Sequence, residues 1–167
     1  MSRVLGQDSA ELVLSRYSQL RDVACAMVRQ ARATVEIVSR DLDPQIYDND
    51  PFAEALRGLV TGDSRRAAVR ILLLQPQIAM TRGSRLIDLA QRLPSFISIH
   101  TPGEAHRDFN QAMLLVDRSG YLHRDQADQI EATASFAAAP RANELGRLFD
   151  EIWDHSTPDQ QSRRLGL

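Results

Sequence analysis

The chain has 167 residues, a length that suits one domain, since single hydrophobic cores commonly span about 100–200 residues. Its 20 basic and 22 acidic residues give a net charge of −2, so the composition provides no bulk attraction to nucleic acid or to an anionic membrane. The N-terminus lacks an apolar signal segment, and no window reaches the roughly 20 apolar residues of a membrane span. We therefore expect a soluble cytoplasmic protein.

All 20 basic residues are arginine, because the sequence contains no lysine. This excludes mechanisms that need a lysine amine, such as Schiff-base chemistry, a phosphate-loop lysine or a lysine general base. Arginine stays protonated and offers a planar fork of donors rather than a point charge. The one cysteine, Cys25, lies among apolar residues and cannot form a disulfide within the chain, so we expect it in the core.

Helices and strands alternate along the first hundred residues. Apolar spacing predicts one long amphipathic helix from Asp8 to Arg32, opened by an Asp8 and Glu11 capping box. A short β-branched strand, Val35–Val38, leads into a polar loop of the kind that borders the ligand crevice in open α/β sheets. The elements expected next are a helix capped by Asp50, a strand over Val69–Leu74, a helix over Thr81–Leu93 and a strand over Phe96–Ile99.

A buried strand and a tight turn stand at the centre of the second half. The apolar run Met113–Val116 is followed by the turn residues Asp117 to Gly120 and by a second strand. A strand over Glu131–Phe136 and a helix opened by Pro140 come next. The predicted fold is α/β, with a mixed, mostly parallel sheet flanked by helices on both faces. We expect a single domain over residues 1–167, with an N-terminal helix over 8–32, a core over 33–156 and a tail over 157–167.

Residues around the central strand repeat the frame of a known motif. Asn110, Ala112 and Asp117 occupy the spacing His-x-Lys-x4-Asp, and Met113–Val116 fills the intervening strand. Together with the order of the elements over roughly residues 20 to 156, this resembles a half-domain of the phospholipase D-like superfamily. The family's downstream Gly-Ser-x-Asn retains only Ser135, and Asn143 followed by glutamate resembles its Asn-Glu pair before the last helix.

The resemblance implies a chemistry that this chain has lost. In the family, one histidine attacks phosphorus, a second protonates the leaving oxygen, and lysines hold the phosphoryl charge. Asn110 is no nucleophile and Ala112 carries no charge, and loss of acid–base participation alone costs about 10²–10⁴ in rate. We therefore expect no phospholipase D-type turnover and no cofactor. Both polar residues also have a structural interpretation, in which Asn110 fixes its loop and Asp117 takes the first position of the turn.

Several residues could border a ligand crevice, and the candidates are Arg40, His106, Arg107, Asn110, His123, Arg124 and Asn143. The alternatives are ordinary ones, since Arg40 could form a solvated pair with Asp41 and a loop histidine such as His106 is usually a surface residue. The turn pair Arg65-Arg66 could contact phosphate or simply be solvated. We expect no metal site, because the histidine spacings match no ligand pattern.

The leading hypothesis is a pseudoenzyme: a non-catalytic phospholipase D-like module that binds a phosphate-containing ligand or a protein partner. The alternative is a phosphodiesterase or nuclease with a remodelled site around His106 and His123, which could form across a homodimer. A third interpretation is an interaction subunit with an exposed apolar patch. We do not expect nucleic acid as a partner, because the sequence shows no basic stripe.

Overall fold

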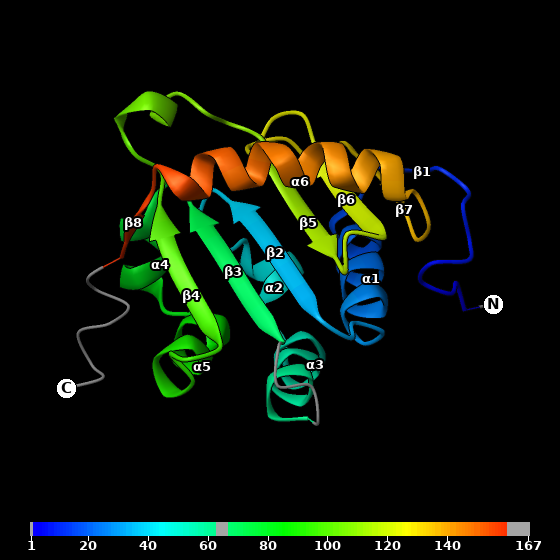
Figure 1. Cartoon of the computed structure of the whole chain (residues 1–167), viewed down its shortest axis with the longest axis horizontal. Coiled ribbons are helices and arrows are strands. Elements are labelled where there is room, and N and C mark those ends of the chain that lie inside the picture. The colour runs from blue at the N-terminus through cyan, green and yellow to red at the C-terminus, as the bar shows by residue number, and fades with distance from the viewer. Residues whose placement is uncertain (1, 63–66, 160–167) are drawn as a thin grey trace.

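The fold is built on one eight-stranded sheet, seen in a computed structural model that describes residues 2–62 and 67–159 (Figure 1). In chain order, the helices and strands are β1 (Leu12–Leu14), α1 (Tyr17–Val28), β2 (Thr34–Ser39), α2 (Pro44–Tyr47), α3 (Asp50–Thr61), β3 (Ala68–Leu73), α4 (Pro76–Arg82), α5 (Arg85–Arg92), β4 (Ile97–Thr101), β5 (Ala112–Val116), β6 (Gly120–Arg124), β7 (Ala132–Ser135), α6 (Ala139–Asp154) and β8 (Thr157–Pro158). A short 3-10 turn at Glu104–His106 precedes β5.

The strands lie in the order β1-β7-β6-β5-β2-β3-β4-β8. The sheet is mixed and the α/β class is confirmed, but the parallel part is smaller than expected. Among the strands that the structure describes, only β2 with β3 and β3 with β4 pair in parallel. The reason is the length of the connections: β5, β6 and β7 follow one another through short links, which allow only antiparallel neighbours.

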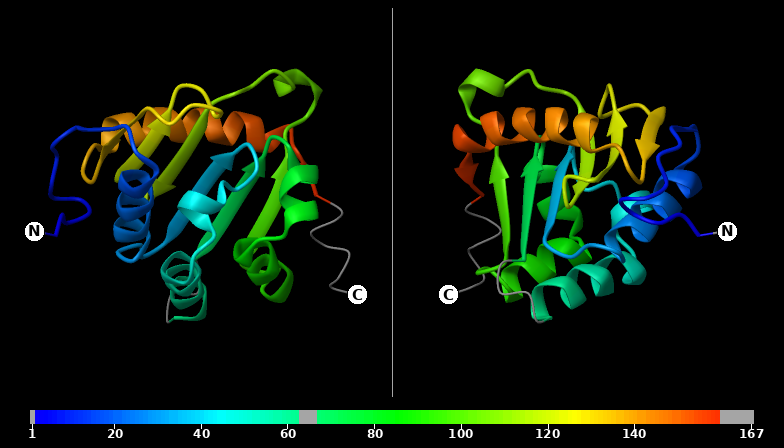
Figure 2. Two further views of the ribbon diagram at one scale, coloured as in Figure 1. Left: turned by 180° about the vertical axis from the view of Figure 1, so that it is seen from behind. Right: turned by 45° about the vertical axis from the view of Figure 1, so that its right-hand side comes forward.

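Helices cover both faces of the sheet, as the sequence predicts. One face, here called the α6 face, carries Val38, Met113 and Leu115 and packs against the apolar side of α6. The opposite face, here called the α1 face, carries Ile37 and Leu114 and packs against the helices α1 to α5. Figure 2 shows α6 alone on its side of the sheet. In the part of the chain that the structure describes, no helix is long and apolar enough to cross a membrane.

The N-terminal helix is shorter than predicted. The expectation of one helix over residues 8–32 is wrong outside α1, because Leu12–Leu14 form the edge strand β1 and pair with β7. The side-chain oxygen of Gln19 accepts hydrogen bonds from the backbone N–H groups of Ser15 and Arg16, at 3.0 and 3.2 Å. These bonds fix the turn between β1 and α1, so the helix begins at Tyr17 rather than at Asp8.

Three further boundaries differ from the sequence analysis. The helix predicted over Thr81–Leu93 is two helices, because Gly83 adopts φ +83° and ends α4, and Ser84 then caps α5. The cap of α3 is Asn49, whose side chain accepts from Phe52 N–H at 2.9 Å, rather than Asp50. The predicted tail begins with strand β8, which pairs with β4.

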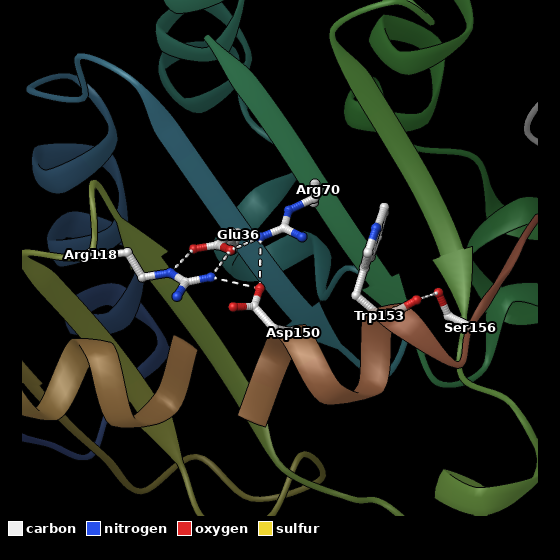
Figure 3. Close-up of polar contacts among 6 residues, drawn as sticks. All are labelled: Glu36, Arg70, Arg118, Asp150, Trp153 and Ser156. Atoms are coloured by element: carbon white, nitrogen blue, oxygen red, sulfur yellow. Dashed lines mark hydrogen bonds and ion pairs between the residues drawn. The ribbon is translucent and has the colours of Figure 1, made fainter. Parts of the chain in front are cut away.

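A buried carboxylate joins α6 to the sheet. Glu36 on β2 is 2% exposed and forms ion pairs with Arg70 on β3 and with Arg118 beyond β5. Both arginines also reach Asp150 on α6, at 3.1 Å from Arg70 and 2.9 Å from Arg118. Figure 3 shows the four side chains in one network between strand and helix. Each charge is neutralised by an opposite charge, so the cost of removing these groups from water is offset.

The carboxyl end of α6 is held by aromatic contacts. The guanidinium of Arg70 lies 4.9 Å from the ring centre of Phe149 and 5.4 Å from that of Trp153. His100 on β4 stacks on Trp153 with ring centres 3.7 Å apart, and its Nδ1 lies 2.7 Å from Ser156 Oγ. Ser156 Oγ donates in turn to the carbonyl of Trp153 at 2.6 Å (Figure 3). These contacts tie the carboxyl end of α6 to β3 and β4.

We expect Gly146→Ala to destabilise the fold by about 1–3 kcal/mol, the usual cost of overpacking. A Cβ atom at position 146 would overlap the guanidinium of Arg118, which cannot move away without breaking its ion pairs. The matched control is Gly58→Ala in α3, where nothing lies within 4 Å of the added carbon and alanine should be neutral or stabilising. Urea unfolding of the three proteins checks this, and equal effects of the two substitutions would contradict it.

The network also predicts acid sensitivity. Burial alone would raise the pKa of Asp150, but hydrogen bonds from Arg118 and Arg70 outweigh it and hold the pKa below its ordinary value of 3.8. The stabilisation by this carboxylate is therefore complete above pH 3.8 and is lost as pH falls through the lower folded-state value. The melting temperatures of wild type and Asp150→Asn should differ most at neutral pH and converge below pH 3.8. A difference that is constant across this range would contradict the assignment.

Candidate functional site

Several of the predicted ligand-binding residues meet at one end of the sheet. Strands β2, β3, β4 and β6 all finish at this end, here called the carboxyl end, and β5 begins there because it runs antiparallel to β2 and β6. Arg40 follows β2, Asn110 precedes β5, and Arg124 is the last residue of β6. The backbone carbonyl of Arg40 accepts from Gln75 N–H at 2.7 Å, which ties the loop after β2 to the loop after β3.

Asp117 lies at the opposite end of the sheet and has a structural role. Its carboxylate accepts hydrogen bonds from the backbone N–H groups of Arg32, Ala33 and Thr34, at 2.8, 2.9 and 2.9 Å. Its backbone has φ +53°, and it occupies the second position of the turn rather than the first. These bonds pull the chain out of α1 and into β2, so Asp117 fixes the entry of the central strand and takes no part in the carboxyl end.

Ala112 and Arg124 are directly opposite each other in the β5–β6 ladder. Each lies two residues from a leucine of the α1 face, Leu114 on β5 and Leu122 on β6. Because side chains two residues apart in a strand lie on the same face, Ala112 and Arg124 are also on the α1 face. At the position where the family motif has lysine, this chain therefore has the methyl side chain of Ala112. The guanidinium of Arg124 lies beside it on the neighbouring strand. Arg124 is 4% exposed, and its Nη1 donates to the carbonyl of Gln129 at 3.0 Å.

His123 lies on the other face from its sequence neighbour Arg124. It is buried on the α6 face, with Nε2 2.9 Å from the side-chain oxygen of Gln111 and Nδ1 3.6 Å from Asp125. Burial lowers the pKa of His123, and the charge of Arg141 lowers it further, against the opposing effect of Asp125. At neutral pH the imidazole is uncharged, so it adds no positive charge to the carboxyl end.

His106 and Arg107 border a different feature. A half-open hollow of about 190 Å³ lies between the end of β3 and the loop before β5. Its lining residues are Leu74, Thr101, Pro102, Gly103, Glu104, His106, Arg107 and Phe109. The His106 ring lies 5.9 Å from that of His155, at the carboxyl end of α6. His123 is on β6, which lies four strands from β4, whereas His155 lies beside Gly103 at the end of β4. At about 4.8 Å per strand, His106 and His123 are separated by roughly 20 Å across the sheet, so they do not share one site in a single chain.

The remaining predicted residues lie apart from Arg40 and Arg124. Asn143 is exposed on α6, and Ser135 is buried at the end of β7, where its hydroxyl accepts from Ala137 N–H at 3.3 Å. Asn110 is exposed; its carbonyl accepts from Ala127 N–H at 2.7 Å and its side chain lies 3.4 Å from Asp128. Asn110 thus holds the loop after β6 in place. The pair Arg65-Arg66 lies outside the described residues.

Residues that the sequence analysis missed complete this end of the sheet. Burial raises the pKa of Tyr17, and a hydrogen bond and the charge of Asp43 raise it further, while Arg124 and Arg40 act in the opposite direction. Burial raises the pKa of Tyr47 to about 12, and Arg124 and Asp43 also act on it. Tyr17 therefore lies within the electrostatic influence of both arginines and of Asp43, and Tyr47 within that of Arg124 and Asp43. Their signal in the sequence was faint, because they come from α1 and α2, and α2 itself was not predicted.

The two arginines differ from the chain's other partly buried arginines in having no acid partner. Arg70, Arg118 and Arg141 each lie within 4 Å of a carboxylate. Among the described residues, no carboxylate lies at ion-pair distance from Arg40 or Arg124, and Arg40 Nε is buried without a hydrogen-bond partner. The two guanidiniums at the carboxyl end therefore carry positive charge that no described carboxylate neutralises. Some of their N–H groups have no acceptor in the described protein.

Comparison with known proteins places this geometry in a family. A family model described as Domain of unknown function (DUF7931) matches residues 16–165. The chain belongs to this family. A search of curated proteins finds no match for the DUF7931 chain.

Solved structures share the fold of this DUF7931 chain. The archaeal chromatin protein TrmBL2, whose structure shows a novel mode of DNA binding, superposes with a TM-score of 0.63 at 16% identity, over 89% of this chain and 54% of TrmBL2. Nuc from Salmonella typhimurium, a phospholipase D family member, gives 0.59 at 12% identity, over 90% and 99%. NucT from Helicobacter pylori gives 0.61 at 10% identity, over 90% and 99%. The predicted phospholipase D-like fold is confirmed; identities this low show the fold alone.

Asp117→Ala should lower the free energy of unfolding by roughly 2–4 kcal/mol, because three backbone donors lose a charged acceptor and alanine disfavours the left-handed backbone. Asp117→Asn is the matched control, since asparagine tolerates φ +53° and keeps one acceptor oxygen, and it should cost less. Denaturant unfolding measures both. If alanine and asparagine cost the same small amount, the tether does not carry the strand entry.

Proposed function

We propose that this chain is a phospholipase D-like module that binds a phosphate-containing ligand at the carboxyl end of its sheet without transferring the phosphoryl group. The observation that supports this is that Arg40 and Arg124 have no carboxylate at ion-pair distance among the described residues, and that Arg40 Nε is buried without a hydrogen-bond partner. A charge withdrawn from water is costly unless an opposite charge compensates it. In a chain whose other partly buried guanidiniums each meet a carboxylate, a bound anion would supply the missing charge.

The chemistry of the frame residues supports binding without turnover. The resemblance sets Asn110 and Ala112 at the positions of the family's nucleophile and phosphate-holding lysine, and neither side chain can perform that role. His123 is neutral and faces the other side of the sheet from Arg124. Phosphoryl transfer through a phosphohistidine needs an imidazole at phosphorus, and this arrangement offers none beside the two arginines.

DNA is the competing ligand, because TrmBL2 has a DNA-binding mode and a similar fold. The net charge of −2 opposes it, since non-specific affinity for DNA depends on neutralising many phosphates at once. The expectation that nucleic acid is not a partner stays a prediction, and so does pairing of two copies. The alternative enzyme with a site around His106 and His123 would need residues from two chains, given the separation of the two histidines.

Phenyl phosphate at a concentration 100 times its dissociation constant should raise the melting temperature of the wild type by about 5–10 °C, since a ligand specific for the folded state stabilises it. Arg40→Gln should reduce this shift, because it removes one of the two free charges. Arg57→Gln is the control: this arginine is exposed on α3, and the shift should remain. Differential scanning fluorimetry across a phosphate titration makes the measurement.

The same preparations should leave bis(p-nitrophenyl) phosphate intact, as followed by nitrophenolate absorbance. Absence of any phosphate-dependent stabilisation in the wild type would contradict binding. Turnover that is lost in His106→Ala would overturn the non-catalytic assignment and favour the remodelled enzyme.

A further inference from the structure

Arg124 differs from Arg40 in how firmly the fold holds it. It ends a central strand, is 4% exposed, and anchors one amino group on the carbonyl of Gln129 at 3.0 Å. Its Nε and Nη2 have no hydrogen-bond partner among the described residues, yet neither is among the fully buried unsatisfied atoms. The guanidinium is therefore positioned by the protein while part of its donor fork stays accessible to a small group.

The strand beside Arg124 leaves its charge uncompensated. Ala112, directly opposite on the same face, contributes one methyl group and no polar atom. The acid that acts electrostatically at this end is Asp43, but its carboxylate is already used by Tyr17 and by Gln45 N–H at 3.0 Å. Arg40, Arg124 and Asp43 together leave one net positive charge near the Tyr17 hydroxyl.

This arrangement selects among phosphate ligands. A planar guanidinium fork matches two oxygens of a phosphate, and such charge-assisted pairs are the strong ones. An accessible surface as small as that of Arg124 can receive a terminal phosphoryl group, which projects from its molecule. It cannot receive the internal diester of a duplex, whose phosphates lie along a rod and are flanked by sugars. The single net charge likewise suits one discrete anion better than a polyanion.

We infer that Arg124 is the principal anion-binding residue of the proposed site, and that the ligand is a terminal phosphate monoester held over the carboxyl ends of β2 and β6 rather than a phosphodiester backbone. The inference rests on the proposed function and deepens it. In this inference the positive charge that binds the phosphate comes from Arg124 on β6, whereas Ala112, directly opposite on β5, contributes no charge.

Titration calorimetry with phenyl phosphate, diphenyl phosphate and a short DNA duplex tests this on the full chain. Arg124→Gln should weaken phenyl phosphate binding by about 10- to 100-fold, as loss of a charge-assisted pair does. Adding Ala112→Lys to that variant should restore binding to within about fivefold of wild type, because a lysine there returns positive charge to the same face. Arg57→Gln, on exposed α3, is the control that should bind as wild type does.

A second variant keeps the test valid if Arg124→Gln does not fold. Asp43→Asn retains the helix-capping oxygen and removes the nearby negative charge, so it should tighten phenyl phosphate binding severalfold. Unchanged affinity in a folded Arg124→Gln variant, or in Asp43→Asn, would overturn the inference while leaving phosphate binding itself intact. Tighter binding of duplex or diphenyl phosphate than of phenyl phosphate would overturn the ligand class. No binding of any phosphate by wild type would refute the proposed function instead.

Discussion

The buried carboxylate of Glu36 is the constraint on which the architecture depends. A negative charge at 2% exposure on the central strand β2 requires compensation, and two arginines from neighbouring elements provide it. Those arginines then recruit Asp150, so the single helix on its face of the sheet is positioned by charge as well as by apolar contact. Removal of one member of such a group leaves another uncompensated. The ion pairs that join α6 to the sheet, and the need for a glycine at position 146 where Arg118 passes, both follow from this one acid.

The same logic separates structural arginines from the candidate site. In a chain without lysine, each guanidinium that leaves water needs acceptors, and most find them in nearby carboxylates. Arg40, in the loop after β2, and Arg124, at the end of β6, have no such carboxylate among the described residues. Asp43 lies close enough to act on the same tyrosines, but it is occupied by Tyr17 and by the cap of α2. The candidate site is thus distinguished by two arginines that have no carboxylate partner in the described part of the chain, rather than by a sequence motif.

The sequence predicted the central elements well, because strands such as β3 and β5 are continuous apolar runs bounded by polar residues. The ends of elements were harder. Gln19 and Asp117 act through hydrogen bonds to backbone that is distant or locally ambiguous, and periodicity contains no trace of them. The splitting of α4 from α5 was readable in Gly83 and Ser84, but the apolar pattern concealed it. Short edge strands depend entirely on tertiary pairing.

The sequence could indicate only part of the arrangement of the candidate site residues, and the reason is geometrical. The motif frame directs attention to the start of β5, and the sequence analysis gives Arg124 and His123 equal weight as neighbours of that strand. Alternation along a strand places them on opposite faces, and only the register against β5 shows which one shares a side with Ala112. Asp117, included through the same frame, lies at the far end of that strand. The tyrosines could not be found because spacing alone does not indicate convergence.

The lengths of the two outermost strands limit how the molecule can associate. β1 has three residues and β8 has two, so each of these strands by itself offers little backbone to an incoming strand, and β8 covers only His100 and Thr101 of β4. Short edge strands of this kind limit the number of backbone hydrogen bonds that an added strand could form with β1 or β8. Among the described residues, the helical surfaces and the loops beyond the strands offer larger areas for a complex than β1 and β8 do.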